Sequence, residues 1–279
     1  MELIFTGKGS AGSWACRGEQ LGKACRATVV PMASAHEISI ADVAVVVKRV
    51  PPELLQALRK ARKPWVLDVV DFYPQPTACH WDRDQAVRWV RNKIAELNPT
   101  AVIWPNRQMG MDCQVDLPST TLYHHHRPSL VRNVIRPKVE KVGYEGEPAY
   151  LAEWRPFLEI ECARRGWEFV VNPESLADLD IVVALRGGQY TGYVPSAWKS
   201  NVKLANAHGS GTPFIGNPES GYLETALGGE KMVSTKKQLR EALDALTPYE
   251  ERLKAKKWIE WSYPVAEAAL DLKAFLRGL

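Results

Sequence analysis

The sequence has no long hydrophobic segment and no closely spaced pair of cysteines. No apolar run approaches the ~20 residues that cross a bilayer, and the start, MELIFTGKGSAG, lacks the basic region and cleavage site of a signal peptide. The cysteines form no C-x-x-C motif, which argues against a disulfide framework or a structural zinc site; they are Cys16, Cys25, Cys79, Cys113 and Cys162. We therefore expect a cytoplasmic protein with reduced, mostly buried thiols.

Clusters of metal-binding residues are also missing. No D-x-D motif follows an expected strand. The consecutive histidines His124, His125 and His126 cannot share one ion from an extended strand, because successive side chains face opposite ways. We expect neither a metal ion nor another cofactor. The net charge of +4 is mildly basic, which permits an anionic partner without requiring one.

What the sequence does have is a regular alternation of short apolar runs and amphipathic segments. This pattern predicts an α/β protein with parallel sheets. The hydrophobic content of 46% in 279 residues is enough to fill two cores. The alternation lapses around residues 129–137, where we place a linker between two doubly wound, Rossmann-like domains, the first over residues 1–132 and the second over residues 133–260.

A glycine-rich loop follows the first expected strand. Gly7, Gly9 and Gly12 match the pattern G-x-G-x-x-G, and together with Ser13 they provide a backbone suited to approach a phosphate. An NAD(P)-dependent oxidoreductase is one interpretation. That fingerprint expects an acidic residue at the end of the second strand, but the first acid after the expected strand at residues 28–32 is Glu37.

Two later strands of the first half are followed by polar residues. Asp71 comes after an expected strand at residues 65–70, where a carboxylate is placed to take a proton from an acceptor hydroxyl, or else to cap a helix or turn. His125 follows a strand at residues 121–123, so it either hydrogen-bonds a phosphate from the rim of a cleft or lies in an exposed loop. We take Asp71 and His125 as the candidate catalytic residues.

The densest positive cluster of the chain surrounds an expected helix at residues 53–63. Its members are Lys48, Arg49, Arg59, Lys60, Arg62 and Lys63. Such a cluster is usually a solvated helix face, and the alternative is contact with a phosphate backbone. Arg59 and Arg62 are candidate acceptor-binding residues, together with Tyr73 and with Arg17, which helical spacing over residues 14–25 leaves exposed.

The stretch from Trp198 to Gly229 predicts helix, tight turn, strand, polar turn and helix. With Ser196 as a cap, Lys199, Lys203 and Asn206 share one helix face until Gly209. After a strand at residues 212–215 come a turn ending in Glu219 and a helix carrying Glu224, where open α/β sheets bind ligands. The lysines form either an anion site or a solvated face, and the glutamates hold hydroxyls or only cap a helix.

This order of residues resembles the donor-binding half of GT-B glycosyltransferases. The resemblance implies a basic helix face and a Pro-Glu turn that together hold a nucleotide-diphosphate sugar, a cleft between the domains, and a last helix, residues 261–279, that returns to the first domain. It implies metal-independent catalysis, with Asp71 as base if the enzyme inverts. The donor-binding residues would be Gly9, Ser13, Gly143, Arg186, Lys199, Lys203, Asn206, Glu219, Ser220, Gly221 and Glu224.

The sequence departs from the GT-B pattern in one respect. Retaining members usually pair two glutamates with seven residues between them, whereas counting back from Glu224 leads to Gly216. Retention and inversion therefore both stay open.

The acceptor is inferred from the basic helix and the resemblance alone. They suit hydroxymethylated pyrimidines in DNA, as in phage DNA glucosyltransferases that act in an infected host, with UDP-glucose as a donor and a monomeric enzyme. A surface glycan or a small molecule is the alternative acceptor. The alternative functions are an NAD(P)-dependent oxidoreductase, a nucleotide-sugar epimerase and a nonenzymatic binding module.

Overall fold

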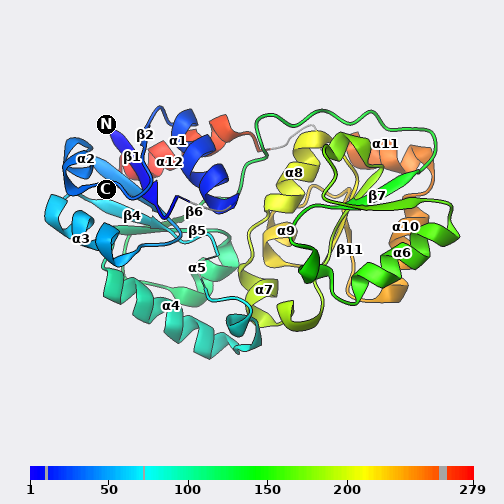
Figure 1. Ribbon diagram of the computed structural model, residues 1–279, viewed down its shortest axis with the longest axis horizontal. Coiled ribbons are helices and arrows are strands. Elements are labelled where there is room, and N and C mark those ends of the chain that lie inside the picture. The colour runs from blue at the N-terminus through cyan, green and yellow to red at the C-terminus, as the bar shows by residue number, and fades with distance from the viewer. Residues whose placement is uncertain (10–11, 72, 258–262) are drawn as a thin grey trace.

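The computed structural model describes residues 1–9, 12–71, 73–257 and 263–279. It shows two parallel β-sheets side by side, each covered by helices (Figure 1). In the described residues the first sheet has the order β2-β1-β3-β4-β5-β6 and the second the order β11-β10-β9-β7-β8. Numbered from its own first strand, each sheet begins 2-1-3-4, so the two halves share one doubly wound plan.

The first sheet is built from short runs that are nearly all apolar. Its strands are β1 (Leu3–Gly7), β2 (Thr28–Val29), β3 (Val43–Val47), β4 (Trp65–Asp68), β5 (Ala101–Trp104) and β6 (Ser119–Thr121). Every residue of β3 and β4 is buried, because both faces of the sheet carry helices. The helices are α1 (Leu21–Ala24), preceded by a π-helical segment (Trp14–Gln20), α2 (Ala35–Ile40), α3 (Pro52–Ala61), α4 (Arg83–Leu97) and α5 (Arg107–Cys113).

The second sheet repeats this construction. Its strands are β7 (Lys141–Tyr144), β8 (Glu168–Val171), β9 (Ile181–Ala184), β10 (Phe214–Gly216) and β11 (Lys231–Met232). The helices of this part of the chain are α6 (Trp154–Arg164), α7 (Tyr193–Trp198), α8 (Val202–Ser210), α9 (Ser220–Thr225), α10 (Lys236–Ala245), α11 (Tyr249–Lys257) and α12 (Val265–Leu276). None of the helices that the structure describes is long and apolar enough to span a membrane.

Two segments of the second half of the chain pack on the first sheet. Helix α12 crosses back and lies against α1, with Leu272 and Leu276 in the core beneath β1 and β3, which confirms the returning helix (Figure 1). Helix α7 was not expected there, yet Trp198 is fully buried in the core that α4 and α5 cover. The sequence prediction of one helix running from Ser196 to Gly209 is wrong, because the chain is extended at Lys199.

Candidate active site between the two sheets

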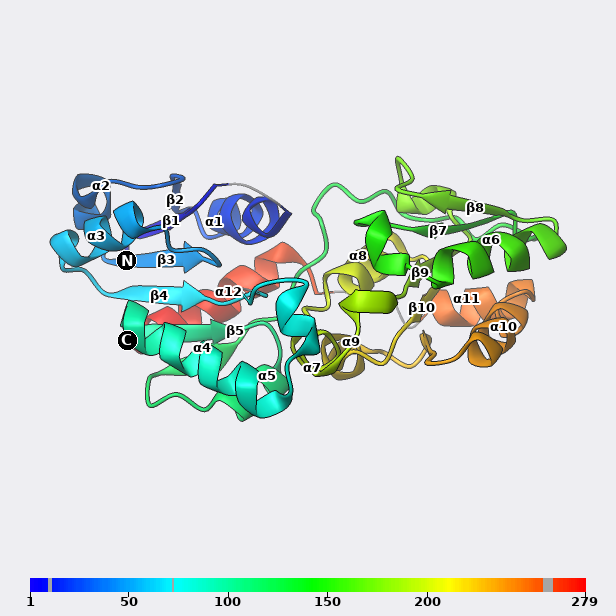
Figure 2. The ribbon, with the colours of Figure 1, turned by 60° about the horizontal axis from the view of Figure 1, so that its bottom comes forward.

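The carboxyl ends of the strands of both sheets meet at one place. Figure 2 shows β3 and β4 pointing toward the middle of the molecule, where the second half begins. Loops after β1, β3, β4, β6 and β7 line one cavity of about 480 Å³, which we call the central cavity. In doubly wound sheets such a crevice lies where the strand order reverses, and it is the usual ligand site.

Both halves of the chain contribute polar residues to the central cavity. The first half supplies Ser13, Lys48, Asp71, His124 and Arg127. The second half supplies Glu145, Gly146, Lys203 and Asn206. Arg127 is paired with Glu145 at 2.7 Å and Lys48 with Asp71 at 2.5 Å, which leaves Lys203 as the cation of this lining without an acidic partner within the described residues.

Asp71 lies where the sequence analysis expected it, and it is paired with two lysines. Lys48 Nζ lies 2.5 Å from Asp71 Oδ1, and Lys199 pairs with the other carboxylate oxygen. Burial alone would raise the pKa of Asp71, but Lys199 and Lys48 outweigh burial and hold this pKa well below its ordinary value. Asp71 thus joins the two halves and orders two lysines in this structure, and its role as a general base stays a prediction.

The histidine run contains a functional candidate at a position that the sequence analysis did not choose. His125 is fully buried, its Nε2 lies 3.2 Å from Gln20 Oε1, and burial lowers its pKa to about 3, so it does not lie at the rim as expected. His124 lines the central cavity, is buried, and neither of its ring nitrogens has a hydrogen-bond partner within the described residues. Successive side chains of an extended segment point to opposite sides, so the sequence already indicated that only one of His124 and His125 can face the cavity.

Arg17 is a structural residue and not an acceptor contact. Its side chain is completely buried, with Nε 3.0 Å from Asp68 Oδ2, and it donates to the carbonyls of Leu122 and Tyr123 at 2.6 and 3.2 Å. It thus ties the π-helical segment to the ends of β4 and β6. The predicted exposure was wrong because the helix face that carries Arg17 packs onto the sheet.

The turn after β7 approaches the central cavity at Gly146, three residues beyond the glycine expected from the sequence. Gly143 is inside the strand, and a Cβ there would lie 2.5 Å from the Leu179 side chain, so its role is packing against the sheet. Gly146, with φ +134°, forms the turn and lines the cavity. A Cβ at Gly146 would lie 3.0 Å from Lys203 Nζ, so this turn and Lys203 face the same space.

Lys203 and Asn206 lie on α8 and face the central cavity, as predicted. Lys203 Nζ is 3.8 Å from the centroid of the Tyr144 ring, which favours the charged amine. Burial and the nearby charge of Arg186 act more strongly and lower the pKa of Lys203 well below its ordinary value. Asn206 donates to Glu145 and accepts from the Arg127 backbone N–H, at 3.2 and 3.1 Å.

Arg186 and Glu219 bind each other at the carboxyl edge of the second sheet. Arg186 Nε lies 2.7 Å from Glu219 Oε1, and both side chains are largely buried. They line a separate cavity of about 250 Å³. The second carboxylate oxygen of Glu219 has no partner within the described residues. Arg186 is thus not brought into the central cavity with Lys203, and its charge is already matched by a carboxylate.

Helix α9 packs at the contact between the two halves. A Cβ at Gly221 would lie 2.5 Å from the Lys199 carbonyl oxygen, so this glycine allows close packing, and it does not line the central cavity. Ser220 is the first residue of α9 and does not line the central cavity. Glu224 accepts from the backbone N–H groups of Arg107 and Gln108 at 2.7 and 2.9 Å and from the Tyr123 hydroxyl at 2.9 Å. Glu224 therefore caps α5, and the prediction that it holds a sugar or ribose is wrong.

Replacing Glu224 by alanine is expected to destabilise the protein without weakening donor binding. The change removes the partner of two N–H groups at a helix N-terminus, which costs about 1–2 kcal/mol. Chemical denaturation measures the loss, with Glu241→Ala on the exposed face of α10 as the control. A loss of nucleotide-sugar affinity at unchanged stability would contradict the assignment of Glu224 as a cap.

The basic cluster of the first half is divided between the two ends of the strands. Lys48 and Arg49 follow β3 and lie at the cavity, whereas α3 runs back over the sheet and carries Arg59 and Arg62 away from it (Figure 2). Ten helical residues span about 15 Å. Arg59 binds the Glu96 carbonyl oxygen at 3.3 Å. The expectation that Arg59 and Arg62 border the cleft is therefore wrong, and the strand-helix-strand order already contained this information.

The remaining predicted residues lie near the first sheet. Ser13 lines the central cavity, and it also lines a narrow adjoining cavity together with Gly9, whose φ is +78°. Tyr73 is buried, with its ring centroid 6.4 Å from that of Trp198, and it lines a further cavity beside Asp71. No group of three or more His, Cys, Asp or Glu side chains within the described residues has the geometry to hold a metal ion.

The architecture is that of solved glycosyltransferase structures. Anabaena HepE in complex with UDP and glucose gives a TM-score of 0.66 at 12% identity, covering 100% of both chains. AviGT4, a glycosyltransferase involved in avilamycin A biosynthesis, gives 0.55 at 12% identity, covering 100% of this chain and 98% of that chain. The lipopolysaccharide outer core galactosyltransferase WaaB gives 0.52 at 12% identity, covering 100% of both.

Sequence comparisons add nothing to this: no protein-family model matches the chain, and no curated protein does. The structural similarity nevertheless confirms the fold. The chain is a GT-B-like α/β protein with two parallel-sheet domains.

Proposed function

We propose that this protein is a glycosyltransferase that moves a sugar from a nucleotide-diphosphate sugar to an acceptor hydroxyl. The observation that carries the proposal is the central cavity of a GT-B-like fold, in which Lys203 of the second half, with no acidic partner within the described residues, lies across from the ion pair of Lys48 and Asp71. HepE, a solved structure of this architecture, binds UDP-glucose. A lysine without an acidic partner suits a diphosphate, because its charge stabilises the negative charge that develops on the leaving group.

The donor diphosphate is proposed to lie against the turn at Gly146 and the amine of Lys203. Gly146 brings the backbone close, and Lys203 supplies a charge that burial leaves under-solvated. Asn206 offers an amide beside them for a donor hydroxyl. Arg186, Glu219 and Lys199 do not bind the donor directly in this proposal, since each is paired with another protein group.

The transfer forms a bond between the acceptor oxygen and the anomeric carbon of the donor, while the bond from that carbon to the phosphate oxygen breaks. The nucleoside diphosphate leaves with the electron pair. Both carboxylate oxygens of Asp71 are bound by lysines and both ring nitrogens of His124 are buried, so neither group is placed to accept the hydroxyl proton in this structure. In this proposal the leaving diphosphate takes the hydroxyl proton, and the binding groups of the central cavity hold donor and acceptor in position.

An oxidoreductase is the weaker alternative. Glu37, the first acid after β2, is engaged in capping α2, where its carboxylate accepts from the Ser34 backbone N–H at 2.7 Å. It is therefore not available to hold the ribose of a dinucleotide.

The main argument for hydroxymethylated DNA as acceptor was a basic cluster at the cleft. Arg59 and Arg62 lie at the C-terminal end of α3, and Figure 2 shows this helix at the side of the first sheet away from the second half. We propose instead that the acceptor is a glycan or a small molecule. The proposed enzyme is a monomer that acts in the cytoplasm without a metal ion.

A thermal-shift panel run in EDTA tests the proposed function. UDP-glucose at a hundred times its dissociation constant is expected to stabilise the fold by ~2.7 kcal/mol, and NAD(P)H is expected to give no shift. Stabilisation that appears only after magnesium or manganese is added would contradict metal independence. A shift with NAD(P)H alone would favour the oxidoreductase.

A further inference from the structure

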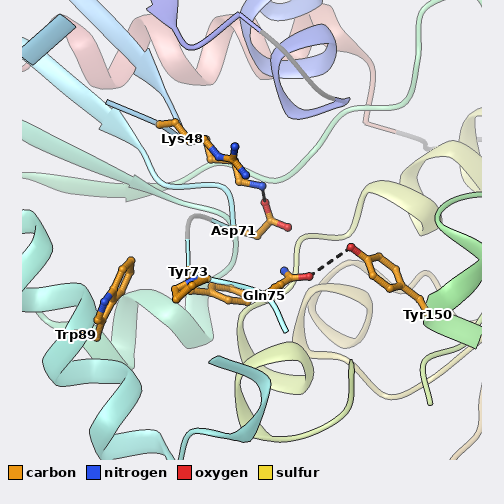
Figure 3. A pocket seen from close by; sticks show the side chains of 8 residues that line it. Lys48, Asp71, Tyr73, Gln75, Trp89 and Tyr150 are labelled. Atoms are coloured by element: carbon orange, nitrogen blue, oxygen red, sulfur yellow. Dashed lines mark hydrogen bonds and ion pairs between the residues drawn. The ribbon is translucent and has the colours of Figure 1, made fainter. Parts of the chain in front are cut away.

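A second cavity adjoins the central cavity and is assigned no role by the function proposed above. It encloses about 450 Å³ and we call it the aromatic pocket (Figure 3). Its lining includes Lys48, Arg49, Asp71, Gln75, Trp89 and Tyr150. Lys48 and Asp71 also line the central cavity, so the two spaces meet at this ion pair. A molecule in the aromatic pocket is therefore placed beside a donor in the central cavity.

The walls of the aromatic pocket are suited to a saccharide ring. Trp89 of α4 and Tyr150 of the second half stand on opposite sides, with Tyr73 between them (Figure 3). Aromatic faces pack against the apolar faces of ligands, while a few polar groups fix orientation. Here two of the polar groups are the Tyr150 hydroxyl and the Gln75 amide; the hydroxyl donates to Gln75 Oε1 at 3.4 Å.

Tyr150 is held in place before any ligand binds. The guanidinium of Arg186 lies 4.8 Å from the centroid of its ring, and the Tyr190 ring centroid lies at 4.6 Å. The pair of Arg186 and Glu219 thus supports the wall of the aromatic pocket. A fixed wall lowers the entropic cost of binding.

The charge at the aromatic pocket is positive. Asp71 is shared between Lys48 and Lys199, so one carboxylate serves two cations. Arg49 is exposed at the pocket, and no ion pair joins it to an acidic side chain in the part of the chain that the structure describes. A guanidinium binds a carboxylate or a phosphate through paired hydrogen bonds.

We propose that the aromatic pocket is the acceptor site and that it takes a saccharide bearing a carboxylate or phosphate, bound by Arg49. This rests on the proposed glycosyltransferase function. The anion lies at Arg49, the sugar ring lies between Trp89 and Tyr150, and the hydroxyl points past Asp71 toward the donor. Duplex DNA fits less well, because duplex binding typically uses about 6–10 phosphate contacts and the pocket lining offers Lys48 and Arg49.

The test offers UDP-glucose with matched acceptors to the full chain. The pairs are p-nitrophenyl glucuronide against p-nitrophenyl glucoside, and galactose 6-phosphate against galactose, which separate carboxylate from phosphate. A hydroxymethylcytosine oligonucleotide is the third arm. An anionic acceptor is expected to exceed its neutral partner in kcat/KM by roughly tenfold or more, the effect of one charge-assisted hydrogen bond.

Arg49→Gln is expected to remove this preference through the KM of the anionic acceptor, whereas Arg59→Gln, at the opposite edge of the sheet, is expected to retain it. Equal use of the neutral partner, a preference that survives Arg49→Gln, or transfer to the oligonucleotide alone would overturn the acceptor assignment. Failure of the protein to bind UDP-glucose in calorimetry would instead overturn the proposed function, and this inference with it.

Discussion

Replacing Lys203 by methionine is expected to lower kcat/KM for the nucleotide sugar by about 10²–10³-fold, the usual effect of removing one group that stabilises developing charge. Lys203 faces the space beside Gly146 and has no acidic partner at ion-pair distance within the described residues. Its charge is thus available to the donor diphosphate. Methionine keeps the apolar stem against the Tyr144 ring, so the unfolding free energy should change little.

The measurement is a donor titration by calorimetry together with steady-state kinetics. Lys237→Met, on the exposed side of α10, is the matched control. An unchanged donor affinity in the Lys203 variant would remove the central cavity from consideration as the donor site.

Donor binding is also expected to depend on pH through Lys203. Its pKa in the free protein is lowered, so a bound diphosphate, which favours the charged amine, raises that pKa and binding takes up a proton. Donor affinity should therefore fall as pH rises above the lowered pKa of the free protein. The same profile in Lys203→Met should lose this component.

Replacing Arg17 by methionine is expected to cost about 3–5 kcal/mol of unfolding free energy, because removing one partner leaves a buried charge uncompensated. Arg17 and Asp68 both have completely buried side chains. Burial raises the pKa of Asp68, and Arg17 opposes this rise. Once Arg17 is gone, the carboxyl must be either protonated or unpaired inside the core.

Urea denaturation of three variants separates this role from acceptor binding. Arg17→Met should be strongly destabilised, and the double variant Arg17→Met with Asp68→Leu should recover much of the loss, since an apolar pair can replace a buried ion pair. A stable Arg17→Met protein with a raised acceptor KM would support the original assignment to the acceptor site.

Much of the fold was predictable from local patterns. The apolar run of β3 and the box of Ser34 and Glu37 that caps α2 are read from neighbouring residues. The alternation of such runs with amphipathic segments led to two parallel sheets, and their carboxyl edges were expected to hold the site. Lys203 and Asn206 were found from the period of one helix, and both line the central cavity.

The partners of the charged residues were not predictable in this way. Asp71 is neutralised by Lys199, which lies 128 residues further along the chain, and Glu224 caps a helix 116 residues before it. Asp112 binds Tyr193 and Trp198 across 81 and 86 residues. These contacts draw α7 into the first core and move the expected donor ligands out of the cavity.

The sequence by itself determined which segments form strands and helices and which sheet edges carry polar side chains, because period and capping depend on residues a few positions apart. Only the tertiary structure decided which of those side chains is free. Arg186 is paired when the second sheet brings Glu219 beside it, and Glu224 is paired when the two halves dock and bring it to the start of α5. His124 and Arg49 became candidates for the opposite reason: each lines a cavity, and within the described residues the His124 ring has no hydrogen-bond partner and Arg49 has no acidic partner.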